Sequence, residues 1–103
     1  MNVVKRLKLG DDERQEIKRV VEACNMARNF FEDDEFKAVN VIGQGHELSQ
    51  EHLTKAQAAI DEARGRVVGT DAHAGMPTEL REQYIKNLYA ASVTVGEWMV
   101  PLR

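Results

Sequence analysis

Residues 48–67 read LSQEHLTKAQAAIDEARGRV, and this stretch decides the fold. Its apolar residues recur at alternating steps of three and four, which is the spacing of one face of an α-helix. These residues are Leu53, Ala56, Ile60, Ala63 and Val67. Ser49 stands at an N-cap position, with Leu48 before it and Leu53 at the fourth helical position, which is the arrangement of a hydrophobic staple. The pattern predicts a helix over about 50–66 with a thin seam that a neighbouring helix can approach closely.

Two further helices are predicted on either side. A wide apolar stripe predicts a helix over about 13–33, and Asp12 and Gln15 before it have the spacing of a capping box. Another stripe predicts a helix over about 79–99, with Thr78 as its cap. The first stripe consists of Ile17, Val20, Val21, Cys24, Ala27 and Phe31, and the second of Leu80, Tyr84, Leu88, Ala91, Val95 and Trp98.

Residues 34–45 fit two structures. Phe36, Val39 and Ile42 have helical spacing, whereas alternation along the segment and the β-branched Val39 and Val41 favour a strand slightly. The sequence leaves both alternatives open.

The N-terminal arm carries a weak strand signal, because Leu7 and Leu9 alternate with basic residues. Pairing of residues 3–9 with residues 34–45 would make a minor two-stranded ribbon. The patterns together predict an all-α fold, a small three-helix (up-down-up) bundle with an extended N-terminal arm. We expect residues 1–103 to form a single helical domain.

Composition narrows the class of protein. The chain is 43% hydrophobic and 30% charged, as in an ordinary globular domain, and its net charge of −3 argues against a general nucleic-acid binder. No apolar run approaches the roughly 18 residues of a membrane span, and no signal-peptide pattern is visible. The single cysteine, Cys24, forms no intramolecular disulfide. We therefore expect a cytoplasmic protein with no membrane partner.

The first and third predicted helices carry more large apolar side chains than one thin interior can take. Large exposed apolar patches mark interfaces, so we predict that the protein binds itself as a homodimer or higher oligomer. The candidate interface residues are Phe30, Phe31, Tyr84, Tyr89, Trp98 and Met99. Tyr and Trp are enriched at interface hot spots, and the same rings could stack on a nucleobase between copies.

A glycine-containing turn ahead of a helix suggests a second hypothesis. Gly43, Gly45 and His46 precede the helix of residues 50–66, and the backbone N–H groups of such a turn can bind an anion. Arg64 and Arg66 would add positive charge. The turn lacks the Lys and Ser/Thr of a P-loop, so it predicts a site for a small anionic ligand and no particular nucleotide.

No residue pattern specifies a reaction, a metal or a cofactor. His46 and His52 are six residues apart, whereas metal-binding histidines on one helix face are four apart. Asp71 and His73 could orient an imidazole, but no nucleophile accompanies them, and Cys24 lies on an apolar helix face. We predict no catalytic residue, metal or cofactor. A histidine acting as a general base keeps an enzymatic activity open.

The C-terminal helix, with Leu88, Ala91 and Val95 followed by Pro101, resembles that of small phage proteins that sequester the cyclic nucleotides signalling infection. The resemblance is confined to this helix and carries no diagnostic motif or site residue. It implies a compact helical oligomer that binds a cyclic nucleotide.

Two functional hypotheses follow. The first is a non-catalytic, homo-oligomeric interaction or regulatory protein that acts through protein–protein contacts, with itself or with an unidentified protein. The alternative is a protein that binds or sequesters a small anionic or cyclic-nucleotide-like ligand, of the phage anti-defence type.

Overall fold

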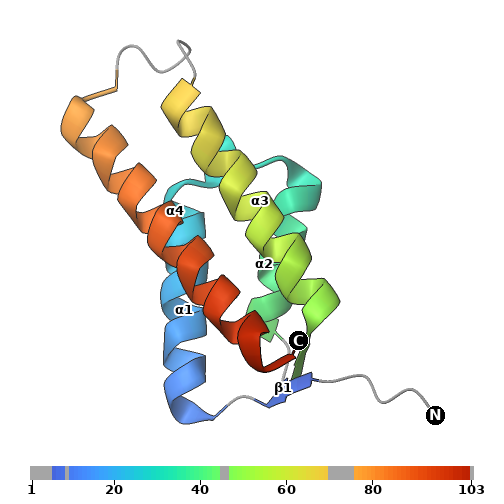
Figure 1. Ribbon diagram of the computed structural model, residues 1–103. Helices are drawn as coiled ribbons and strands as arrows, with labels where there is room; N and C mark the ends of the chain where they lie inside the picture. The colour runs from blue at the N-terminus through green and yellow to red at the C-terminus, as the bar shows by residue number, and fades with distance from the viewer. Residues whose placement is uncertain (1–5, 9, 45–46, 70–75, 103) are drawn as a thin grey trace.

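The computed structural model describes residues 6–8, 10–44, 47–69 and 76–102, which form a bundle of four α-helices (Figure 1). The helices are α1 (Asp11–Met26), α2 (Asp33–Gln44), α3 (Gln50–Gly69) and α4 (Thr78–Met99), with 3-10 turns η1 (Arg28–Phe30) and η3 (Val100–Leu102). The predicted all-α class is confirmed. The predicted number of three helices is wrong for the described residues, because the helix expected over 13–33 is broken and residues 34–44 of the open segment belong to a separate helix, α2.

The chain turns a corner where one continuous helix was predicted. Phe31 is extended, with φ −97° and ψ 139°, so the backbone leaves the helical path after η1. The backbone N–H of Glu32 then donates to Oε1 of Glu35 at 2.8 Å, which satisfies a donor at the start of α2. The Arg28 guanidinium stabilises this corner by donating to the Phe31 carbonyl at 3.1 Å and to the Asp33 carboxylate at 2.8 Å.

Each helix packs against the next one in the chain, and α1 closes the bundle against α4. Figure 1 shows α3 and α4 side by side, running in opposite directions. This arrangement leaves each helix one side that faces neither of its neighbours.

The three predicted helix caps have different outcomes. Ser49 caps α3 as predicted, because its Oγ accepts from the His52 N–H at 3.2 Å, and Leu48 and Leu53 on either side are fully buried. The predicted caps of the other two helices are wrong. α1 follows Gly10 and α4 follows Pro77, with no side-chain hydrogen bond at either cap, so neither Asp12 nor Thr78 has the predicted role.

Two short strands pair at one end of the bundle. β1 (Arg6–Lys8) runs antiparallel to β2 (Glu47–Ser49), with Leu7 opposite Leu48. The predicted N-terminal strand is confirmed, but its predicted partner, segment 34–45, is wrong. Residues 34–44 of that segment form α2 instead, and β2 begins after it.

Candidate interaction surface

Four of the six predicted interface residues lie inside the single chain. Phe30, Phe31, Trp98 and Met99 are all buried in the core between the helices. The crowding argument from the sequence is wrong for these four, because a fourth helix encloses a larger interior than three helices would.

The two tyrosines differ from each other. Tyr84 is partly buried, and its ring meets the Phe30 ring edge-on with centroids 5.8 Å apart. Tyr89 is exposed, and the Arg64 guanidinium lies over its ring at 5.1 Å. Of the predicted interface set, Tyr89 is therefore the residue whose side chain faces solvent.

The three described residues of the predicted anion site, Gly43, Arg64 and Arg66, do not converge. Arg64 faces α4 through Tyr89, whereas Arg66 faces α2, where it binds Glu35 in the first turn. Gly43 lies in the last turn of α2, so it is at the other end of that helix. Gly45 and His46 lie outside the described residues, as do Asp71 and His73.

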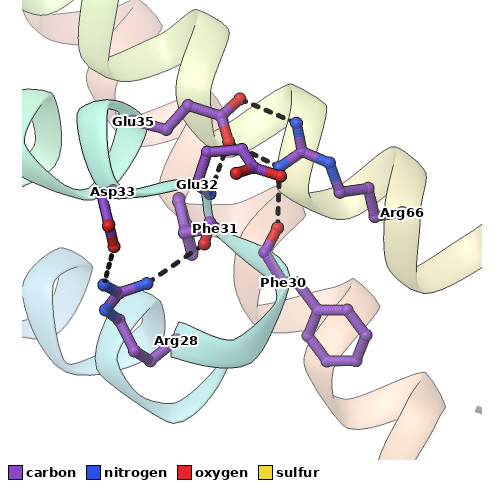
Figure 2. A network of polar contacts seen from close by, with 7 residues as sticks. All are labelled: Arg28, Phe30, Phe31, Glu32, Asp33, Glu35 and Arg66. Carbon is purple, nitrogen blue, oxygen red and sulfur yellow. Dashed lines mark hydrogen bonds and ion pairs between the residues drawn. The ribbon is translucent and has the colours of Figure 1, made fainter.

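Arg66 has a structural role, which Figure 2 shows. Its guanidinium donates to both carboxylate oxygens of Glu35, at 2.5 and 3.2 Å, and to the Phe30 carbonyl at 2.8 Å. These bonds join α3 to α2 and to η1. The paired Arg66 charge is therefore committed to the fold and is poorly placed to bind a ligand.

The outward side of α4 carries a group of exposed apolar side chains. It comprises Lys86, Tyr89, Ala90, Val93 and Glu97, and it continues onto η3 at Val100. We call this set the α4 outer face. Its side chains are exposed, whereas Ser92 and Met99 on a neighbouring side of α4 bond to Asp61 and Thr54 of α3.

The apolar residues of the α4 outer face are large and well exposed. Tyr89 is 56% exposed, Val93 43% and Val100 60%. Six large hydrophobic side chains are exposed in the described residues, and half of them lie on this one face. Single exposed apolar residues need no explanation, whereas a group of them on one helix face is the kind of surface through which proteins associate.

Sequence reasoning missed most of this face. It singled out Tyr89, but not Lys86, Ala90, Val93, Glu97 or Val100. The usable signal was the second helical stripe, with steps of four, three and four from Lys86 to Glu97, on a different side of the helix from the Leu88–Val95–Trp98 core stripe.

Two hollows flank α1. One, of about 310 Å³, lies between α1 and α4, and Val20, Ala23 and Ala91 form part of its lining. The other, of about 370 Å³, lies between α1 and α2, with Ile17 and Val21 in its lining and Arg14 and Lys18 beside them. Gly43 and Ile42 complete the second hollow from α2.

The described residues contain few other groups that could react or bind a metal ion. Cys24 is fully buried, and burial raises the pKa of its thiol to about 12, so the thiol stays protonated and is a poor nucleophile. No three His, Cys, Asp or Glu side chains among the described residues form a group that could hold a metal ion. His52 is exposed on α3.

Within the same described ranges, no helix has the combination of length and apolar character needed to cross a membrane. Comparison of the chain with protein-family models, curated proteins and solved structures finds no match.

Proposed function

We propose that this protein is a non-catalytic interaction protein of the cytoplasm that works as a homo-oligomer, through the α4 outer face. The observation that carries the proposal is the exposure of Tyr89, Val93 and Val100 on one side of one helix. Removing apolar surface from water is the main driving force of protein association, worth roughly 25 cal/mol per Å². A second copy of the chain supplies the same apolar surface.

Tyr89 is suited to anchor such a contact. The Arg64 guanidinium over its ring restrains the side chain before any partner binds. A restrained aromatic side chain loses little conformational entropy on binding, which is one reason why tyrosine is common at hot spots.

The test of this proposal is the substitution Val93→Glu, measured as molar mass by sedimentation equilibrium. The wild type should associate as its concentration rises toward about 1 mM, where even a weak contact is populated. Val93→Glu should remain a monomer, because it places a charge in the centre of the apolar face. Glu has a higher helix propensity than Val, so α4 itself should not be weakened.

Val41→Glu is the matched control. Val41 is 41% exposed on α2, outside the α4 outer face, so this variant should associate like the wild type. A wild type that stays monomeric over the whole range would contradict the proposal, as would equal loss of association in the two variants.

The hollow between α1 and α2 favours a second candidate function, the binding of a small anionic ligand. Its volume of about 370 Å³ falls within the range of ligand pockets, roughly 300–1,000 Å³. Apolar side chains from Ile17 and Val21 line it, Lys18 supplies positive charge, and Glu22 adds one carboxylate to the same lining. Gly43, one of the residues predicted to contact such a ligand, also lines it. A ligand held there would raise the melting temperature by mass action.

A further inference from the structure

We infer that the partner on the α4 outer face is a second copy whose α4 lies antiparallel to the first, related by a two-fold axis, with Lys86 of each copy beside Glu97 of the other. This inference rests on the proposed function and specifies its geometry.

The spacing of the α4 outer face carries the inference. Lys86, Ala90, Val93 and Glu97 follow one another at steps of four, three and four, so the series is the same when it is read backwards. When the second helix lies beside the first and runs in the opposite direction, Lys86 is therefore opposite Glu97 of the second copy and Ala90 is opposite its Val93.

Charge distinguishes this arrangement from its parallel alternative. In a parallel pair, Lys86 would face Lys86 and Glu97 would face Glu97, and like charges in direct apposition disfavour a pairing. In the antiparallel pair, both contacts are between opposite charges. Neither the Lys86 nor the Glu97 side chain forms a hydrogen bond or an ion pair with another described residue, so both are available.

Side-chain size fits the same register. Ala90 is small and exposed, so it leaves room for Val93 of the second copy between the two helices. Packed helices lie roughly 8–10 Å apart, and a small residue at the crossing point permits the shorter distances. In the same register Tyr89 lies at the level of Thr94 of the second copy and Val100 at the level of its Gln83, so Ala90 and Val93 form the apolar centre of the contact.

A two-fold arrangement also fixes the size of the assembly. Each copy uses the same face, and pairing covers both faces, so association stops at a dimer. A single helix pair buries less surface than the roughly 1,600 Å² of a standard interface, so the dimer should dissociate on dilution.

Charge reversal tests the register. Lys86→Glu and Glu97→Lys each create two like-charge contacts in the dimer, and each should raise its Kd by roughly tenfold. The double variant restores opposite charges and should return the Kd to within about threefold of the wild type. Lys37→Glu and Glu22→Lys, at exposed positions on α2 and α1, control for the change in net charge and should leave the Kd unchanged.

Cysteine cross-linking gives an independent readout. In the antiparallel dimer, Lys86→Cys chains should form disulfides with Glu97→Cys chains when the two are mixed. Two copies of either variant alone would hold their cysteines about 16 Å apart along the axis, at 1.5 Å per residue. Disulfides within each variant alone would indicate a parallel pair and overturn the inference. The native Cys24 is buried and should not compete.

The outcomes separate the inference from the function on which it rests. Suppose that Val93→Glu disrupts the dimer, but that the double charge reversal does not recover the affinity lost in the single charge reversals. This result would overturn the register and leave the proposed function standing. A wild type that never associates would remove both.

Discussion

Glu35 joins three segments of the chain through one carboxylate. Its oxygens accept from the Arg66 guanidinium of α3 and from the backbone N–H of Glu32, and Arg66 reaches on to the carbonyl of Phe30. The hydrogen bond from Arg66 is the main reason that the pKa of Glu35 lies below its ordinary value of 4.5. The pair is partly buried, with side-chain exposures of 33% for Arg66 and 19% for Glu35, so solvent screens it only in part.

Glu35→Gln should lower the free energy of unfolding by about 1 kcal/mol at pH 7, because it replaces a charge-assisted bond with a neutral one. Since folding lowers the pKa of Glu35, its stabilisation is present above pH 4.5 and is lost as the pH falls through the lower folded value. The difference between wild type and variant should therefore shrink in acid, measured by urea unfolding.

Glu51→Gln is the control for this prediction. Glu51 pairs with Lys55 at 3.2 Å, but both side chains are well exposed, so its loss should change the stability little at any pH. Equal effects of Glu35→Gln and Glu51→Gln would contradict the structural role of the Arg66 pair.

The sequence could not reveal the roles of single residues that depend on distant partners. Arg64 and Arg66 are two positions apart and were predicted to act together, but they face different helices. Which helix a side chain faces depends on the packing of the whole bundle, and Glu35 is 31 residues away from Arg66 in the sequence. Cys24 was placed correctly on a buried face, since its helical stripe is local information.

At the scale of the helix, α3 has its own start signal. The hydroxyl of Ser49 accepts from the N–H of His52, which would otherwise lack an intrahelical partner. β2 ends at this same residue, so Ser49 joins the last residue of a strand to the first turn of a helix.

Ser49→Ala should reduce the stability by about 1 kcal/mol, the usual effect of removing an N-cap hydroxyl. Thr78→Ala is the matched control, because the start of α4 has no side-chain cap hydrogen bond to lose. It should change the stability by only a few tenths of a kcal/mol. Thermal unfolding followed by circular dichroism measures both, and a larger loss for Thr78→Ala would contradict the assignment of caps.

Helices with long stripes were predictable, and the break between α1 and α2 was not. The apolar spacing continues through Ala27 to Phe31 as though one helix ran on, because η1 keeps those side chains buried. The corner depends on Arg28 bonding forward to Asp33, which hydrophobic spacing does not encode. The helical spacing of Val39 and Ile42 was a correct signal for α2, but the β-branched Val39 and Val41 also favoured a strand.

For the whole molecule, the fourth helix changes which apolar side chains are buried and which are exposed. With α2 in the bundle, most of the large aromatic side chains fit inside one chain, and half of the exposed large hydrophobic side chains of the described residues lie on the α4 outer face. The case for self-association therefore rests on Tyr89, Val93 and Val100, and not on the buried Phe30 and Trp98.

Thermal unfolding distinguishes the two candidate functions. Mass action stabilises whichever state binds, so the melting temperature of a dimer should rise with protein concentration, by roughly 4–8 °C for each kcal/mol that association adds. We expect this rise for the wild type, its absence for Val93→Glu, and no response to nucleotides or other small anions. A rise with ligand but not with protein concentration would favour the hollow between α1 and α2 and count against the dimer.

Trp98 is the single tryptophan of the chain, and it lies buried in the core, away from the exposed stripe of Lys86 to Glu97. An indole in an apolar interior emits at shorter wavelengths than one in water, so its emission should shift to the red when the helices separate. Its side chain is buried on a different side of α4 from the outer face, so we expect contacts there to change its emission little. The protein thus carries an optical signal for folding that is insensitive to association, and the two equilibria can be observed separately in one sample.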